Sequence, residues 1–138
     1  MALHAGLLRL ETGGDGEIVD LTEGVRTVVE RSAVDAGVAV VFVAGSTAAI
    51  TTMEHEAGGV LDLQALLDRL IPVDAPYEHN ARNADTNAHA HLRAAIIGPS
   101  ESIPVVEGRL WLGTWQQVVL IDFDDRPRER TVSVHVLS

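Results

Sequence analysis

The sequence has 138 residues, which fits one domain, and its composition excludes several classes of site. It contains no cysteine, so a disulfide framework, a thiolate zinc site, an iron–sulfur cluster and a cysteine nucleophile are excluded. All ten basic residues are arginine, which excludes a Walker-type phosphate loop and a lysine Schiff base. The net charge is −10 and the arginines are scattered, so we expect no nucleic-acid partner.

The amino-terminal residues lack the basic region and the continuous apolar stretch of a signal peptide. No later apolar run approaches the roughly 18 residues of a membrane-spanning helix. We therefore expect a cytoplasmic protein without a membrane partner.

The first half of the chain combines strand patterns with one helix pattern. Asp20 and Glu23 are typical of a capping box, and they predict a helix that stops at Gly37. The next run is apolar and rich in β-branched residues, which predicts a central strand covered on both faces. The predicted strands of this half cover residues 3–10, 17–21, 38–44 and 48–53.

The second half begins with helical periodicity over residues 60–70, which Pro72 ends. Residues 73–86 form the longest segment without periodicity, and such loops are often functional. A third helix is predicted over residues 87–97, before Gly98 and Pro99. The remaining predicted strands cover residues 103–106, 110–123 and 131–137. Hairpins at the end of the chain, with helices earlier, favour a single α+β domain over residues 1–138.

Three histidines, His79, His89 and His91, fall within thirteen residues of sequence. Imidazole is a common ligand of zinc and similar metals, and three protein ligands leave one position open for water or substrate. Positions i and i+2 of a regular helix point about 200° apart, which opposes a shared target for His89 and His91. The alternatives are histidines that are solvated or hydrogen-bonded, or that bind substrate or transfer protons without a metal.

Gly45, Ser46 and Thr47 follow the predicted central strand. Their N–H groups and two hydroxyls could cradle an anion, although a simple turn has the same composition. Farther along the chain, Glu54 and Glu56 flank His55. They could act as a base or as metal ligands, or be solvated surface charges.

The segment Gly113-Thr114-Trp115-Gln116 interrupts the apolar pattern of a predicted strand. Glycine inside a strand often marks a bulge or a close approach of the backbone to another group. Trp115 could therefore pack in the core at a bulge, or it could line a pocket.

Taken together, several segments resemble the YjbQ family, whose members include a protein described as a secondary thiamine-phosphate synthase. The resemblance covers nearly the whole chain, and its strongest part combines Gly-Arg-Leu, Gly-Thr-Trp-Gln and the Ala-His-Leu segment some twenty residues upstream. The matching segments are residues 45–54, 77–79, 90–94, 98–100, 103–105, 108–110 and 112–116.

The resemblance implies a compact α+β fold of sheets packed as a sandwich with about three helices, assembled as a homotrimer with pockets near the subunit interfaces. It places His79 and His91 in the pocket, with His89 as a companion, and implies that a divalent metal, zinc or magnesium, binds there. Glu54 matches the acidic position of the first motif. Many family members have histidine where this chain has Gly45, so another residue substitutes for it or the activity differs.

The resemblance also implies an activity, which joins a pyrimidine methyl diphosphate to a thiazole phosphate with loss of diphosphate. A cation must stabilise the departing diphosphate. Glu54 and His91 are the candidate catalytic residues, and His79, His89 and His91 the candidate metal ligands. The candidate residues for binding the small phosphorylated molecule are Ser46, Thr47, Asn87, Arg93, Ser100, Thr114, Trp115 and Gln116.

Two other functions remain open at this point. The acidic net charge fits poorly with two phosphorylated substrates. One alternative is a non-catalytic trimeric module that binds a metal or a small anion. A metal-dependent phosphoester hydrolase would use a metal-bound water as its nucleophile.

Overall fold

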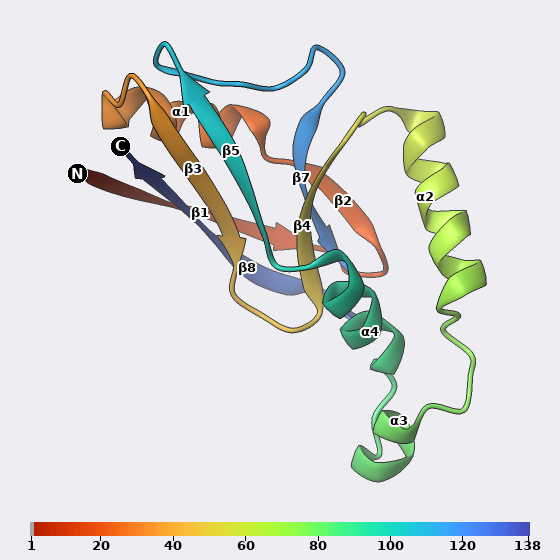
Figure 1. The fold of residues 1–138 in the computed structure, drawn as a ribbon. Coiled ribbons are helices and arrows are strands. Elements are labelled where there is room, and N and C mark those ends of the chain that lie inside the picture. The colour runs from red at the N-terminus through yellow and green to blue at the C-terminus, as the bar shows by residue number, and fades with distance from the viewer. Residues whose placement is uncertain (1) are drawn as a thin grey trace.

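The computed structural model describes residues 2–138 as one α+β domain (Figure 1). Its elements are β1 (Leu3–Thr12), β2 (Glu17–Asp20), α1 (Thr22–Ser32), β3 (Gly37–Val43), β4 (Ala48–Met53), α2 (Ala57–Leu70), α3 (Glu78–Asn83), α4 (Ala88–Ile97), β5 (Ser100–Val106), β6 (Arg109–Leu110), β7 (Gln117–Asp122) and β8 (Arg128–Leu137).

The strands form a five-stranded sheet of order β1-β8-β3-β5-β6 and a three-stranded sheet of order β2-β7-β4. The pairings among these strands are antiparallel, and β3 is the middle strand of the larger sheet. The longest pairing runs from Leu3 opposite Leu137 to Thr12 opposite Arg128, which brings the two ends of the chain side by side (Figure 1). The predicted α+β class and the central position of residues 38–44 are therefore confirmed.

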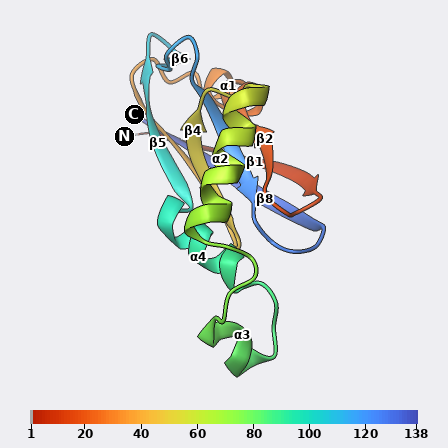
Figure 2. The same ribbon diagram turned by 90° about the vertical axis from the view of Figure 1, so that its right-hand side faces the viewer.

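The three-stranded sheet is the middle layer of the fold. Alternate residues of a strand face opposite sides, and β7 uses both of its faces. Leu120 packs toward the five-stranded sheet and α1, whereas Ile121 packs toward α2 and α4. Both side chains are at most 1 % exposed. Figures 1 and 2 show α2 and α4 on the side of β4 and β7 that faces away from the five-stranded sheet.

Helix α1 covers the inner face of the larger sheet near β1. A Cβ atom on Gly6 of β1 would lie 2.7 Å from a methyl group of Val28, so the helix approaches the strand closely. The predicted capping box of Asp20 and Glu23 does not form, because the N-cap of the helix is Leu21 and the Glu23 side chain accepts from Arg26 instead. Asp20 lies one residue earlier and accepts a hydrogen bond from the backbone N–H of Thr22, 2.9 Å away. The predicted stop at Gly37 is wrong, because the helix ends at Ser32 and the C-cap residue Ala33 adopts a left-handed conformation with φ 56°.

Three other predictions need correction. Residues 73–86 contain the short helix α3, so the domain has four helices within residues 2–138. The predicted strand 110–123 is interrupted after β6, and residues 111–116 form a loop that leaves Trp115 73 % exposed. The central strand is covered on one face only, because Phe42, on the outer face, is 42 % exposed.

No helix within residues 2–138 has the length and apolarity needed to span a membrane.

The middle-layer packing predicts a large effect of truncating Leu120. Leu120→Ala should lower the free energy of unfolding by about 2–5 kcal/mol, because it removes buried methyl groups and leaves a cavity between the sheets. The measurement is urea unfolding followed by circular dichroism. Asp62→Ala, at an exposed position of α2, is the control and should change stability by less than about 0.5 kcal/mol. Equal stability of the two variants would contradict the packing of Leu120 between the two sheets.

Candidate functional site

A pocket lies where the turn after β3 meets α4. It has a volume of about 240 Å³ and is lined by Gly45, Ser46, Ala48, His91, Ala94, Ala95 and Pro99. The turn is exposed at Gly45 and Ser46, while Thr47 behind it is buried. Helix α4 ends at Gly98, and the carbonyls of Gly98 and Pro99 accept hydrogen bonds from Ile50 and Val43, which fixes the helix against β4 and β3. Two predicted site residues, Ser46 and His91, therefore line one cavity.

His79 lies beside His91, with 4.7 Å between the ring centroids. The two rings come from α3 and from the first turn of α4. Asn80 joins these helices, because its side-chain oxygen accepts a hydrogen bond of 3.0 Å from the backbone N–H of Ala88. The same oxygen lies 3.1 Å from Nδ1 of His79. The segment from 77 to 91 thus brings two imidazoles to the edge of the pocket.

His89 does not join this pair. It is 3 % exposed, and its Nδ1 atom makes no hydrogen bond within residues 2–138. Burial lowers the pKa of His89, and the nearby positive charge of Arg93 lowers it further. The i and i+2 positions on a regular helix explain why His89 and His91 point in different directions.

The donor set of one chain does not fit the expected metal centre. Among residues 2–138, no three or more His, Asp or Glu side chains are grouped in a way that could hold a metal ion. His79 and His91 supply two neighbouring nitrogen donors, and His89 lies apart from them. A third protein ligand would have to come from outside the described chain.

Behind the pocket, the structure contains a buried polar network that the sequence analysis missed. Arg130 makes a bidentate ion pair with Asp122, with Nε–Oδ2 and Nη2–Oδ1 distances of 2.7 and 2.8 Å. Its Nη2 atom also donates to the Thr47 hydroxyl at 2.7 Å, and that hydroxyl donates to Asp124 at 3.1 Å. Arg128 completes the network by donating to Asp124 at 2.8 Å. The sequence signal for this network was the presence of Asp122 inside the apolar run 117–123 and of Asp124 just after it.

The network holds its carboxylates in the charged form. Burial alone would raise the pKa of Asp122, but hydrogen bonds from Arg130 and Thr12 outweigh burial and lower it. The pKa of Asp124 is also lowered, because hydrogen bonds from Arg128 and from the backbone of Asp125 outweigh its burial. Thr47 therefore has its hydroxyl engaged inside the protein, and it is not among the residues that line the pocket.

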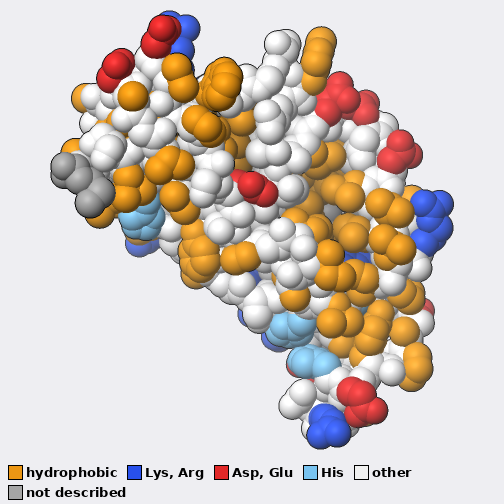
Figure 3. All heavy atoms as spheres, viewed as in Figure 1, with side chains coloured by type: hydrophobic (Ala, Val, Ile, Leu, Met, Phe, Trp, Pro, Cys, Tyr) orange, Lys and Arg blue, Asp and Glu red, His pale blue; other side chains and the backbone are white. Residues whose placement is uncertain are grey.

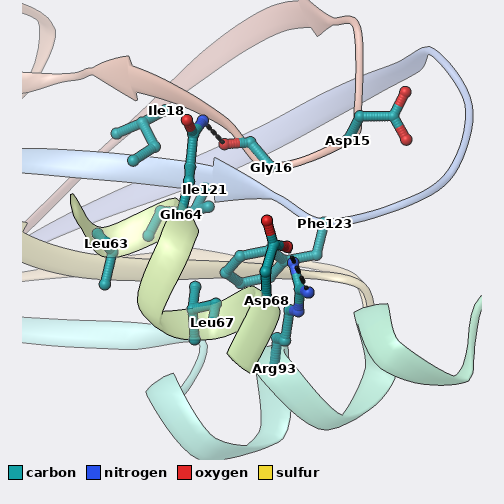
Figure 4. Close-up of a pocket in the computed structure, with 10 residues that line it drawn as sticks. All are labelled: Asp15, Gly16, Ile18, Leu63, Gln64, Leu67, Asp68, Arg93, Ile121 and Phe123. Carbon is teal, nitrogen blue, oxygen red and sulfur yellow. Dashed lines mark hydrogen bonds and ion pairs between the residues drawn. The ribbon is translucent and has the colours of Figure 1, made fainter. Parts of the chain in front are cut away.

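Two further predicted anion-binding residues are also engaged within the fold. Asn87 donates to Asp124 over 3.5 Å. Arg93 donates to the carbonyl of Ile71 at 2.7 Å and to Asp68 at 3.1 Å. It lies beside a separate cavity of about 170 Å³ between α2 and the three-stranded sheet (Figure 4). Arg93 thus fastens the carboxyl end of α2 to α4, away from the histidine pair.

The remaining predicted residues gather at the other end of β4. Glu54 follows this strand and is exposed, as are Thr114, Trp115 and Gln116 of the loop before β7. The side-chain amide of Gln116 donates to the Thr52 hydroxyl at 3.0 Å, which attaches the loop to this end. Six strand residues at about 3.3 Å each separate Glu54 from the Gly45–Ser46 turn by roughly 20 Å. Ser100, by contrast, starts β5 next to pocket-lining Pro99.

Residues 7–138 match the model of a family described as UPF0047 protein YjbQ-like. This chain belongs to the YjbQ family. A UPF0047 protein of Methanothermobacter thermautotrophicus is 39% identical over 136 residues, which cover 99% of this chain and 93% of that protein. One of Archaeoglobus fulgidus is 37% identical over 94% of this chain and 98% of its own length.

Crystal structures of similar proteins have the same fold. A YbjQ-like protein of unknown function from Sulfolobus solfataricus superposes with a TM-score of 0.90 at 34% identity, over 99% of both chains. A hypothetical protein from Aeropyrum pernix also gives a TM-score of 0.90, at 36% identity over 97% of this chain and 98% of that one.

The buried network predicts how stability depends on pH. Both aspartates have lowered pKa values in the folded state, so their contribution is complete above the ordinary value of 3.8 and is lost as the pH falls below it. Asp122→Asn should lower the free energy of unfolding at pH 7 by about 3–5 kcal/mol, because it leaves Arg130 without its charged partner.

Urea unfolding at pH values from 7 to 2 measures this effect. The gap between wild type and Asp122→Asn should narrow below about pH 4. There the carboxylate of the unfolded chain protonates, whereas that of the folded protein, with its lowered pKa, stays charged to a lower pH. Asp62→Asn, at an exposed site, is the control. A gap that stays constant down to pH 2 would contradict the role of the charged carboxylate.

Proposed function

We propose that this protein binds the phosphate or diphosphate end of a small molecule at the Gly45–Ser46 turn, and that it catalyses a reaction of the thiamine-phosphate synthase type. That reaction joins a pyrimidine methyl diphosphate to a thiazole phosphate and releases diphosphate. The observation that carries the proposal is the pocket that combines the Gly45–Ser46 turn with the imidazole of His91, beside His79. Backbone N–H groups, a hydroxyl and imidazoles are suitable donors for phosphate oxygens.

The chemistry assigned to these residues follows from charge. The departing diphosphate gains negative charge as the carbon–oxygen bond breaks, so donors aimed at it lower the barrier. His91 of α4 can donate a hydrogen bond or a proton to a leaving oxygen, and Ser46 can donate from the turn after β3. These two residues bind and stabilise the leaving group in the proposal.

The pocket of one chain is small for two substrates. Its volume of about 240 Å³ is below the roughly 300–1,000 Å³ of typical ligand sites. Glu54 and Trp115, two of the candidate site residues, lie at the far end of β4. We therefore place the complete site between copies of the chain, with Glu54 and Trp115 of one copy facing His91 of the next.

The homotrimer in this proposal is supported by exposed apolar side chains. Helix α2 has one buried residue, Leu67, although it is 14 residues long. Leu61 and Leu70 on α2 are 66 % and 67 % exposed, and Ile96 on α4 is 73 % exposed. Figure 3 shows hydrophobic side chains gathered over α2 and α4. Exposed apolar surface of this kind marks contacts with other protein chains, and a ring of three copies buries two different surfaces of each copy.

A divalent metal, zinc or magnesium, remains a separate expectation. His79 and His91 could supply two of its ligands, with others from a neighbouring copy or water. Elemental analysis of protein purified with zinc and magnesium tests it, and His79→Ala should abolish any stoichiometric metal. No step of the proposed chemistry depends on this metal.

The second candidate is a trimeric module that binds an anion without catalysis. The distance between Glu54 and His91 within one chain favours it, as does the net charge of −10, which opposes binding of two phosphorylated substrates.

Activity is tested by measuring thiamine-phosphate formation from the two phosphorylated precursors. His91→Ala should reduce kcat/KM by about 10²–10⁴-fold, because it removes a proton donor from the leaving group. Thr27→Ala, on the exposed face of α1, is the control. Diphosphate binding without product formation by the wild type would reject the enzyme and leave the binding module.

Complementation tests whether the site spans two copies. Glu54→Gln and His91→Ala should each be inactive alone, whereas trimers assembled from an equal mixture should recover about a quarter of the wild-type activity. A quarter is expected because each site needs an intact Glu54 from one copy and an intact His91 from the next. No recovery in mixed trimers of two folded variants would place each site within one chain.

The oligomeric state is measured by light scattering during size-exclusion chromatography. Wild type should have three times the chain mass of 14.7 kDa. Leu70→Glu should shift the protein to monomers, because it places a charge in the apolar surface of α2. Thr27→Glu introduces the same charge on α1 and should remain trimeric. A wild-type monomer would contradict the assembly.

A further inference from the structure

We propose that Arg130 supplies the positive charge of the anion site, and that it reaches the ligand past position 45 because Gly45 has no side chain. This inference rests on the proposed binding of a phosphate group at the Gly45–Ser46 turn. It assigns to one arginine of the buried network a second role, as a residue that contacts the ligand.

The geometry at Gly45 carries the inference. Gly45 has a φ of 142°, a backbone conformation that residues other than glycine rarely adopt. A Cβ atom at this position would lie 2.8 Å from Nη1 of Arg130, which is closer than real Cβ contacts. Gly45 also lines the pocket. The missing side chain therefore leaves Nη1 next to the backbone of a residue that borders the pocket.

The hydrogen bonds of Arg130 leave the Nη1 atom of its guanidinium group free. Its Nε and Nη2 atoms donate to Asp122 and Thr47. Nη1 makes no hydrogen bond within the described part of the chain. Arg130 is 7 % exposed, so its position is fixed and little water screens its charge. A planar, fixed guanidinium with free donors is well suited to a phosphate oxygen.

The charges around Arg130 balance, so the acidic net charge of the protein is not concentrated at this position. Asp122 and Asp124 are the acidic groups nearest to Arg130, and Arg128 and Arg130 balance them within the network. The two aspartates are fully buried, whereas the pocket is bordered by Ser46 and His91. The ligand class is therefore a phosphate or diphosphate group held between Arg130, Ser46 and His91.

The test compares binding of inorganic phosphate and of diphosphate by calorimetry. Gly45→Ala should weaken binding of both by about tenfold or more, because the new methyl group lies against Nη1 and displaces it. Gly16→Ala is the matched control, since Gly16 also has a positive φ, of 83°, but a Cβ there meets no atom within 4 Å. It should bind both anions within about twofold of wild type.

The outcomes separate this inference from the proposed function. Equal binding by wild type and Gly45→Ala overturns the role of Arg130 and leaves the pocket in place. If the wild type binds neither anion, both the role of Arg130 and the proposed anion site are overturned. If Gly45→Ala does not fold, NMR of the arginine side chains in wild type decides. Phosphate should then shift the Arg130 Nη resonance and leave that of Arg93 unchanged, and an unchanged Arg130 resonance rejects the inference.

Discussion

The ion pair between Arg130 and Asp122 is the interaction on which the candidate site depends. It joins the start of β8 to the end of β7, and through Thr47 it also holds the turn after β3. Breaking a buried pair leaves an uncompensated charge, so its two partners stay together in the folded state. Because three segments converge on one guanidinium, the position of the pocket-lining turn is fixed by residues that come from the far end of the sequence.

The layers of the fold explain why the candidate residues separate into two groups. Strand β4 belongs to the middle layer and runs from the Gly45–Ser46 turn to Glu54. Its length therefore sets the separation between the histidine pair and the Trp115 loop. In the proposed function, one chain would hold the anion-binding end of the site, and a neighbouring copy would bring Glu54 and Trp115 to it. The exposed leucines of α2 are the surface proposed for binding such a copy.

The three histidines illustrate how local geometry divides a sequence cluster. His79 and His91 meet because Asn80 fastens α3 to the start of α4. His89, two residues before His91 on the same helix, is buried away from them. Its lowered pKa favours the neutral imidazole, which is consistent with a structural position rather than with a charged group at the site.

The sequence by itself determined the α+β class, the central strand at residues 38–44 and the family, because strand periodicity and short motifs are local patterns. Helix periodicity also predicted the divergence of His89 from His91. Only the tertiary structure decided that Thr47, Asn87 and Arg93 bond within the protein. It also placed Trp115 in an exposed loop and Arg130 behind Gly45. Residues 45 and 130 meet because β8 pairs with β3, and the partners of a buried charge depend on such long-range pairing, which no local pattern specifies.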